Sequence, residues 1–207
     1  MDYRFYGRIL IGNSITTSDI RTFKTRLCEF FRRSRITRMP CACLLPPEVY
    51  PDASEWGPPL WTVLHSIAEK VGSSQFSQYA EDERRALIKM VRYLENVIPC
   101  PSCREHYEVY LAEHPIEKQL KELTHSELRD YIKKWFWELH NWVNESLKRP
   151  LYHYIDLTPA YSRTNIRATM KTLEIPMMRA IRVQTGRLMA YKEFVKQVNI
   201  LLSIYGI

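Results

Sequence analysis

Glycine is scarce in this chain, with six in 207 residues, whereas there are 13 tyrosines, seven phenylalanines and five tryptophans. No glycine-rich loop of the kind that cradles a nucleotide phosphate is present. This composition favours a helical protein over an α/β nucleotide-binding fold. The hydrophobic content of 45% is sufficient for one domain with elaborated ends.

The chain also lacks long apolar runs. None approaches the roughly 20 residues that a membrane-spanning helix needs. The N-terminal stretch Met1-Asp2-Tyr3-Arg4 lacks the apolar core of a secretion signal. We therefore expect a soluble protein that is not classically secreted.

The net charge of +7 is unevenly distributed. Residues 1–39 carry +6 and residues 155–207 carry +5, while residues 40–154 carry −4. The acidic middle argues against a nucleic-acid-binding core, although the basic ends could contact RNA, an anionic membrane surface or an acidic partner. We interpret the ends as solvated helix faces, so nucleic-acid or membrane contact is the less favoured alternative.

Five cysteines are too few for a disulfide-rich scaffold, and their odd number leaves at least one thiol free or paired between chains. They are Cys28, Cys41, Cys43, Cys100 and Cys103. Apolar residues recur at helical spacing after Ser18, with basic residues mostly on the other side. We expect a helix that docks by its Phe and Leu side chains, with Cys28 as a small core residue. A mitochondrial presequence is the alternative.

Prolines crowd the segment from Met39 to Pro59, which holds six of the 12 prolines. This density predicts an extended linker. Cys41 and Cys43 lie within it, so their thiols are expected to be mobile.

Four amphipathic segments follow and predict a helix bundle. They run from about Pro59 to Val71, from about Glu81 to Val97, from near Pro101 to Pro115, and from the capping box Thr124-x-x-Glu127 to just before Pro150. The fourth carries an apolar stripe at helical spacing, made of Leu128, Ile132, Trp135, Leu139, Val143 and Leu147. Residues 151–176 give mixed signals. An apolar stripe from Met177 to Ile204 predicts a last helical segment, long enough to cover the bundle or to make an oligomer contact.

The C-x-x-C motif of Cys100 and Cys103 lies at the expected start of the third bundle helix. Two cysteines at this spacing can close a small, reducible disulfide ring. A helix N-terminus favours the thiolate form through its unpaired N–H groups and dipole. A zinc site completed by Cys41 and Cys43 is an alternative, although C-x-C spacing is poor for chelation by one loop. A thioredoxin-like site would need a preceding strand, and residues 81–98 have a helical pattern instead.

Two further clusters carry imidazole and aromatic groups. Trp61 and His65 are four residues apart and share one helix face, as do His140 and Asn144, with Val143 on the same side. Singly, each histidine is more often a satisfied core residue. Together with a redox-type cysteine pair, the two faces suggest a flat heteroaromatic ligand held between helices. Lys148 and Arg149, at the end of the last bundle helix, are placed to meet phosphates.

These motifs resemble the Erv/ALR family of FAD-linked sulfhydryl oxidases. The matching patterns are W-G-x-x-x-W-x-x-L-H at 56–65, P-C-x-x-C at 99–103 and H-N-x-V-N-x-x-L-x-x-P at 140–150. They occur in the family's order and at about its separations, over roughly residues 54–150. Three matches in order are far more specific than any one of them.

The resemblance implies a four-helix bundle around the FAD isoalloxazine, with a short fifth helix, usually as a homodimer. Cys103 would lie next to the flavin, and Cys100 would exchange with a dithiol substrate. Reduced flavin would pass two electrons to O₂ and yield hydrogen peroxide. The cofactor-binding residues that it implies are Gly57, Trp61, His65, Trp137, His140, Asn141, Val143, Asn144, Lys148 and Arg149.

The chain departs from the family pattern at several positions. Trp137 and Tyr154 stand where cellular members usually have two bridged cysteines, so aromatic packing is expected in place of that staple. Lys148-Arg149 replaces a usual Gly-Lys pair, and Tyr161 stands where a tryptophan is often found. The basic N-terminal arm and the C-terminal extension have no counterpart in the family core. This pattern looks more like the oxidases of large DNA viruses, so we expect the host cytoplasm or the virion, with the mitochondrial intermembrane space as the alternative.

Our interpretation is an FAD-dependent thiol oxidase that forms disulfides in protein substrates. Cys100 and Cys103 would be the redox pair, and Cys41 and Cys43 a possible shuttle; an intersubunit bridge or free thiols are the alternatives for the shuttle pair. Expected partners are thiol-containing proteins, among them a thioredoxin-like relay protein, with O₂ and a second copy of the chain. The expected organisation is a basic arm (1–39), a proline-rich segment (40–55), the FAD-binding core (56–154) and a helical extension (155–207).

Two other functions remain open. One is a non-enzymatic helical interaction or scaffold protein whose cysteines bind zinc or are structural. The other is an oxidase core that keeps FAD mainly for folding while its basic ends do the binding.

Overall fold

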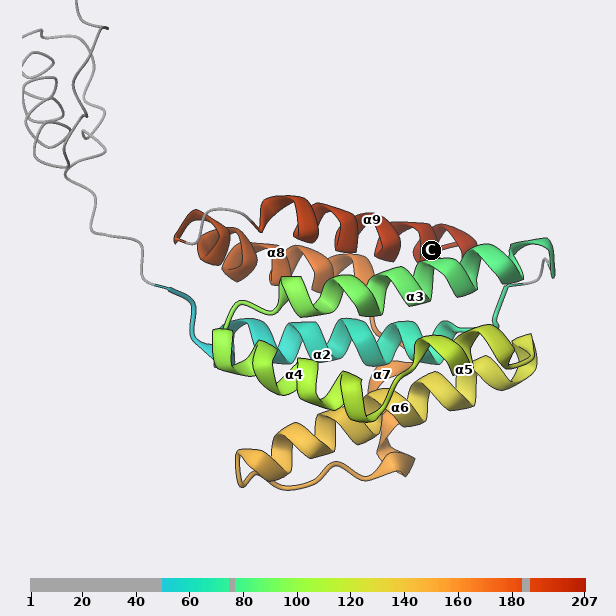
Figure 1. The fold of residues 1–207 in the computed structure, drawn as a ribbon. Helices are drawn as coiled ribbons and strands as arrows, with labels where there is room; N and C mark the ends of the chain where they lie inside the picture. The colour runs from blue at the N-terminus through green and yellow to red at the C-terminus, as the bar shows by residue number, and fades with distance from the viewer. Residues whose placement is uncertain (1–49, 75–76, 184–186) are drawn as a thin grey trace, which may run out of the picture. The chain divides into compact units, whose positions relative to one another are not determined.

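Helices are the only regular elements in the part of the chain that the structure describes, which is residues 50–74, 77–183 and 187–207 of a computed structural model (Figure 1). The all-α fold is confirmed. The elements are α2 (Ala53–Lys70), η2 (Ser77–Tyr79), α3 (Ala80–Val97), α4 (Pro101–Glu113), α5 (Glu117–Glu122), α6 (His125–Ser146), η3 (Tyr154–Asp156), α7 (Leu157–Tyr161), α8 (Ile166–Val183) and α9 (Leu188–Ile204). The predicted N-terminal helix, Cys28, Cys41 and Cys43 lie outside the described residues.

The four predicted bundle helices correspond to α2, α3, α4 and α6. The capping box that starts α6 is present: the Thr124 side chain and the Glu127 carboxylate each accept a backbone N–H of the other residue. Four members of the predicted α6 stripe are buried, namely Leu128, Ile132, Trp135 and Leu139. Leu147, predicted to point inward, is 54% exposed because it follows the end of the helix.

We predicted an extended linker as far as Pro59. This prediction is wrong from Ala53 onward, because α2 begins there. Asp52 and Glu55 form a capping box there, so the signal Asp-x-x-Glu was present in the sequence. Pro58 and Pro59 lie inside the helix, where they lack the N–H groups that would bond the carbonyls of the two residues at positions 54 and 55. Both of those residues are exposed, so water can satisfy their carbonyls.

The prediction of a single helical segment from Met177 to Ile204 is also wrong, because two helices cover these residues. The predicted segment comprises the second half of α8 and all of α9, and α8 begins 11 residues earlier, at Ile166. Two short helices, α5 and α7, were not predicted from the residue pattern. The family resemblance implies one short helix beyond the bundle, whereas the described residues contain both α5 and α7.

The C-terminal helices pack on the bundle of the same chain. α8 lies against α2 and α9 lies against α3 (Figure 1). Apolar side chains from both helices belong to the same hydrophobic core as α2, α3 and α6; they include Leu173, Met177, Phe194, Val198 and Leu201. The described residues from Tyr50 onward therefore form one compact unit. No helix among the described residues is long and apolar enough to cross a membrane.

Candidate functional site

The C-x-x-C motif forms a disulfide at the N-terminus of α4. Cys100 and Cys103 are bonded to each other, with Cα atoms 5.2 Å apart. Cys100 is the N-cap of α4, and its Sγ accepts the backbone N–H of Cys103 at 3.2 Å. The Ser102 hydroxyl lies 3.2 Å from the same sulfur. Pro101 occupies the first turn, where its missing N–H costs no hydrogen bond. A thiolate formed at Cys100 would thus be stabilised by the helix N-terminus.

Trp61, His65 and His140 come together between α2 and α6. The Trp61 indole and the His140 imidazole stack with centroids 4.1 Å apart and planes 8° apart. His65 Nε2 lies 3.0 Å from His140 Nδ1, so one imidazole donates a hydrogen bond to the other. Tyr161 of α7 also stacks on His65, with ring centroids 4.8 Å apart. The structure thus brings the two predicted helix faces together.

Both imidazoles of this cluster are held neutral. Burial, followed by the neighbouring His140, lowers the pKa of His65 to about 3. Burial likewise lowers the pKa of His140 to about 4. A neutral ring in an apolar setting can accept or donate one hydrogen bond and can stack on another flat ring.

α4, which carries the disulfide, packs against α6 close to His140. His106 lies one turn after Cys103, and its ring meets the edge of Trp142 with centroids 6.0 Å apart. Tyr110, one turn further along α4, packs on the same indole at 5.6 Å. Cys103 and Val143 both pack against the common core.

Trp137 and Asn141 hold the loop that follows α6. The Trp137 indole N–H donates to the Tyr152 carbonyl at 2.7 Å. The Asn141 amide both donates to that carbonyl, at 2.9 Å, and accepts the Tyr152 N–H, at 2.8 Å. The Trp137 and Tyr154 rings meet edge to face with centroids 5.4 Å apart. The expected aromatic packing at these two positions is confirmed.

The other predicted cofactor residues lie along α2 and at the end of α6. Asn144 is half-buried, and within the described ranges its side-chain amide has no hydrogen-bond partner. Lys148 and Arg149 are exposed beyond the end of α6. Arg149 lies close enough to lower the pKa of Asp52, after the larger effect of hydrogen bonds from Ser54. A Cβ built on Gly57 would meet no atom within 4 Å.

Two tyrosines of the site were missed by residue-pattern reasoning. Tyr161 stacks on His65, as described, and the Tyr152 ring lies parallel to His140 at 6.4 Å. Both belong to residues 151–176, where the sequence has mixed periodicity. The only signal was the resemblance, which placed Tyr161 where the family often has a tryptophan.

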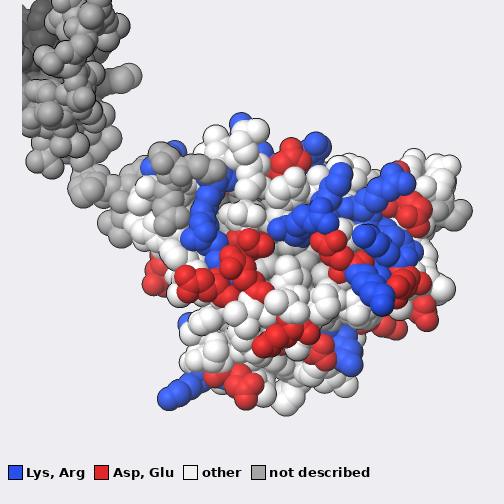
Figure 2. All heavy atoms as spheres, in the orientation of Figure 1, with Lys and Arg blue, Asp and Glu red and all other residues white. Residues whose placement is uncertain are grey.

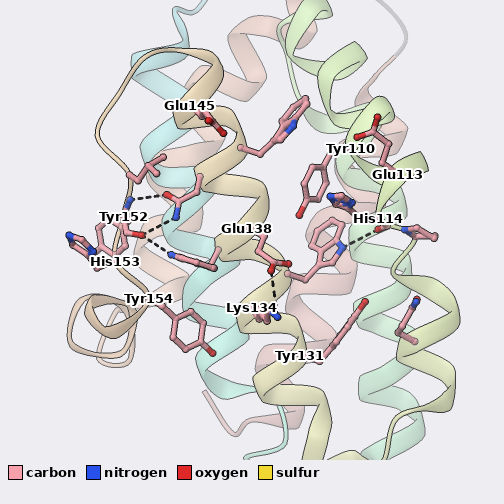
Figure 3. Close-up of a pocket in the computed structure, with 17 residues that line it drawn as sticks. Tyr110, Glu113, His114, Tyr131, Lys134, Glu138, Glu145, Tyr152, His153 and Tyr154 are labelled. Atoms are coloured by element: carbon pink, nitrogen blue, oxygen red, sulfur yellow. Dashed lines mark hydrogen bonds and ion pairs between the residues drawn. The ribbon is translucent and has the colours of Figure 1, made fainter.

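A separate groove of about 880 Å³ runs along α6 (Figure 3). In Figure 3, Tyr110, Glu113 and His114 line it from α4, and Tyr152 and Tyr154 line it from the loop after α6. Trp61, His65 and both disulfide cysteines are not among the lining residues. The groove therefore meets the site at Trp137, Asn141 and Tyr152 but is not lined by Trp61, His65 or the disulfide.

A comparison with known protein families identifies the family of this chain. The model described as the Erv1/Alr family matches residues 58–162, half of the chain. The chain belongs to the Erv1/Alr family. The matched region of this Erv1/Alr protein includes the disulfide, the ring cluster and α7.

Three curated relatives are similar to this Erv1/Alr chain. The mitochondrial FAD-linked sulfhydryl oxidase ERV1 of Saccharomyces cerevisiae is 26% identical over 102 residues, which cover 49% of this chain and 48% of that protein. The mitochondrial FAD-linked sulfhydryl oxidase erv1 of Schizosaccharomyces pombe is 27% identical over 103 residues, covering 50% and 51%. The FAD-linked sulfhydryl oxidase ERV1 of Oryza sativa subsp. japonica is 26% identical over 98 residues, covering 47% and 44%.

The chain thus spans about half the length of the curated relatives it matches. No solved structure matches the chain. Tyr50 and the helices α8 and α9 lie outside the part that matches the Erv1/Alr family.

Proposed function

We propose that this protein is an FAD-dependent sulfhydryl oxidase that forms disulfide bonds in protein substrates. The observation that carries the proposal is the Cys100–Cys103 disulfide at the N-cap of α4, inside the region that matches the Erv1/Alr family. The names of the three relatives, all FAD-linked sulfhydryl oxidases, support the cofactor and the reaction class.

The residues present fit a flavin. Trp61, His140, His65 and Tyr161 offer flat, uncharged rings from three helices. The half-buried Asn144 amide has no partner among the described residues and is available to a ring nitrogen or oxygen. Open space beside Gly57 would admit a ligand close to the α2 backbone. Trp61, His65, His140, Val143 and Asn144 would hold the ring systems, and Lys148 and Arg149 would meet the phosphates.

Trp137 and Asn141 have a different role in this proposal. Their polar atoms are used by the Tyr152 backbone. We therefore propose that they act on the cofactor through the loop after α6, by holding Tyr152 beside His140.

The cysteine pair carries the thiol chemistry. A substrate thiolate attacks Cys100 Sγ, which forms a mixed disulfide and releases Cys103 as a thiolate. A second substrate thiolate attacks the substrate sulfur of that bond and releases the Cys100 thiolate, which the Cys103 N–H stabilises. The substrate leaves with a new disulfide, and two electrons and two protons have moved to the cysteine pair. When bound, FAD accepts those electrons and passes them to O₂, which yields hydrogen peroxide.

Partners and location belong to the same proposal. The substrates would be thiol-containing proteins, in some cases through a thioredoxin-like relay, and the Cys41-x-Cys43 pair would shuttle electrons to Cys100. A homodimer follows from the resemblance and would be detected by light scattering. For the location, the resemblance to viral oxidases supports the host cytoplasm or the virion, and the names of the two yeast relatives support mitochondria.

The organisation of the chain is proposed on the same grounds. We propose a basic arm at 1–39, a proline-rich segment at 40–55, the FAD-binding core at 56–154 and an extension at 155–207. The basic residues of the extension give little support to a nucleic-acid surface. On the face drawn in Figure 2, Lys and Arg side chains are interspersed with Asp and Glu. Arg179 of the extension, for example, pairs with Glu55.

The zinc-binding alternative loses support from the disulfide. Cys100 and Cys103 are bonded to each other, so the two thiolates that a zinc site would need are not available in this form. Among the described residues, which do not include Cys41 and Cys43, no group of three or more His, Cys, Asp or Glu side chains could hold a metal ion.

The test is an absorption spectrum of the purified protein, followed by oxygen uptake with dithiothreitol. We expect a flavin spectrum and thiol-dependent oxygen uptake that Cys103→Ala abolishes and that Cys28→Ser leaves unchanged. A folded but colourless protein would remove the proposed function and make zinc analysis the next step. A yellow protein without thiol-dependent uptake would retain the cofactor and remove the activity.

A further inference from the structure

The two backbone carbonyls just before Cys100 are both held by side chains from distant parts of the chain. The Tyr50 hydroxyl donates a hydrogen bond to the Pro99 carbonyl. The Arg187 guanidinium donates to the Ile98 carbonyl at 3.1 Å. These donors are 49 and 89 residues away from their acceptors in sequence.

Residues 58–162 match the Erv1/Alr family. Tyr50 lies before this region and Arg187 lies after it. Arg187 is the N-cap residue of α9, and α9 packs on α3, the helix that leads directly to Ile98. The backbone that enters the disulfide is therefore held by one residue before α2 and by one residue of the C-terminal extension.

The surroundings of Arg187 make this contact specific. Arg187, Tyr50 and Pro99 line one small enclosed space with residues of α3, α8 and α9. Arg187 is half-buried, so its charge is less screened by water than that of an exposed arginine. A hydrogen bond from a charged donor is also stronger than one from a neutral donor.

We propose that Arg187 is a positioning residue for the Cys100–Cys103 pair, and that the C-terminal extension sets how readily this pair accepts electrons. This inference rests on the proposed oxidase function, since it concerns the same pair. The hydrogen bond to Ile98 holds the turn in which the Cys103 N–H meets Cys100 Sγ. The guanidinium charge, held at the carbonyl two residues before Cys100, favours the thiolate of the reduced form.

The experiment measures the equilibrium between this disulfide and glutathione at one fixed pH. The full chain carries Cys28→Ser, Cys41→Ser and Cys43→Ser, so that only Cys100 and Cys103 exchange, and the reduced fraction is read by alkylation and mass spectrometry. Arg187→Met is expected to lower the equilibrium constant for reduction about tenfold, which is ~30 mV for a two-electron couple.

Three further variants separate the causes. Arg187→Lys keeps the charge, so its equilibrium constant for reduction should be close to that of the background chain. Arg187→Gln keeps a donor without the charge, so its equilibrium constant should lie nearer to that of Arg187→Met. Lys192→Met is the matched control, because Lys192 is exposed on α9 and its loss removes the same charge. If Arg187→Met does not fold, Arg187→Gln and Tyr50→Phe serve in its place, with smaller shifts in the same direction.

Equal equilibrium constants for the folded Arg187 variants and Lys192→Met would overturn the inference. The measurement needs neither flavin nor oxygen, so that result would leave the oxidase proposal standing. A pair that glutathione does not reduce in the background chain would instead contradict the oxidase proposal itself.

Discussion

At the scale of single residues, the site depends on two histidines that share one hydrogen bond. His65 and His140 both have pKa values lowered by burial, to about 3 and about 4. In the unfolded chain a histidine has a pKa near 6.5. The unfolded state therefore binds more protons than the folded state at any pH between these values.

The free energy of unfolding should consequently fall as the pH is lowered. The contribution of the neutral pair is complete above a pH of about 6.5 and is lost progressively toward pH 4. The variant with His65→Gln and His140→Gln should lose less of its unfolding free energy than the wild type between pH 6.5 and 4.5, as measured by urea denaturation. His153→Gln, at an exposed position, should keep the wild-type slope. An unchanged slope in the double variant would contradict the assignment.

Lys148 adopts a backbone conformation that suits glycine. Its φ is 54°, in the left-handed region. The Lys148 N–H bonds the Glu145 carbonyl and the Arg149 N–H bonds the Asn144 carbonyl, which is the Schellman arrangement at the end of α6. The Cβ of a lysine is strained at this position.

Lys148→Gly should therefore stabilise the protein by ~1 kcal/mol relative to Lys148→Ala. The two variants lose the same charge and the same side-chain contacts, so their difference isolates the Cβ. Chemical denaturation of the flavin-free protein gives both free energies of unfolding. A glycine variant no more stable than the alanine variant would show that the left-handed conformation does not persist in solution.

At the scale of elements, the loop after α6 is attached by packing. The Trp137 and Tyr154 rings meet at 5.4 Å, and the Trp137 indole also bonds the Tyr152 carbonyl. These contacts hold Tyr152 parallel to His140. The loop thus positions part of the ring cluster.

A double-mutant cycle tests this attachment. Trp137→Ala, Tyr154→Ala and the double variant should show a coupling energy of about 0.5–1.5 kcal/mol, as expected for an aromatic pair. Denaturant unfolding supplies the four free energies. Leu151→Ala combined with Trp137→Ala is the control pair, because Leu151 is an exposed residue of the same loop. Additive effects of Trp137→Ala and Tyr154→Ala would show that the ring contact contributes nothing.

Element types were predictable from the sequence where local signals agreed. The α6 start followed from Thr124-x-x-Glu127 and its apolar stripe from a spacing of three and four. The start of α2 was missed because two prolines outweighed the capping box at Asp52. The break between α8 and α9 was missed although Gly186, a helix-stopping residue, lies between them in the sequence.

The short-range contacts within one helix were predictable, but the long-range contacts near the cysteine pair were not. Residues four apart on one helix were placed together correctly, as with Trp61 and His65. The contacts of Tyr50 and Arg187 with the backbone before Cys100 join residues 49 and 89 positions apart. No local periodicity encodes such contacts, because they arise only when whole helices pack.

At the scale of the whole molecule, the C-terminal extension and the bundle share one hydrophobic core. Phe194 of α9 has none of its surface exposed and lies in the same cluster as residues of α2, α3 and α6. The extension should therefore unfold together with the helices of the bundle.

Phe194→Ala should lower the free energy of unfolding by about 3–5 kcal/mol in a single cooperative transition. Fluorescence of the bundle tryptophans and circular dichroism should give the same midpoint. Met189→Ala, on the same helix at a position that is 67% exposed, should change stability by less than about 0.5 kcal/mol. Two separate transitions, with only one affected by Phe194→Ala, would contradict a shared core.

In the proposed reaction, electrons pass from thiols to FAD through the Cys100–Cys103 pair. The most direct test is anaerobic mixing with dithiothreitol while the visible flavin absorption is followed. The chain with Cys28→Ser, Cys41→Ser and Cys43→Ser should lose this absorption, because the remaining pair suffices. The same chain with Cys103→Ala added should keep it. Bleaching of the Cys103→Ala variant at the undiminished rate would contradict the claim.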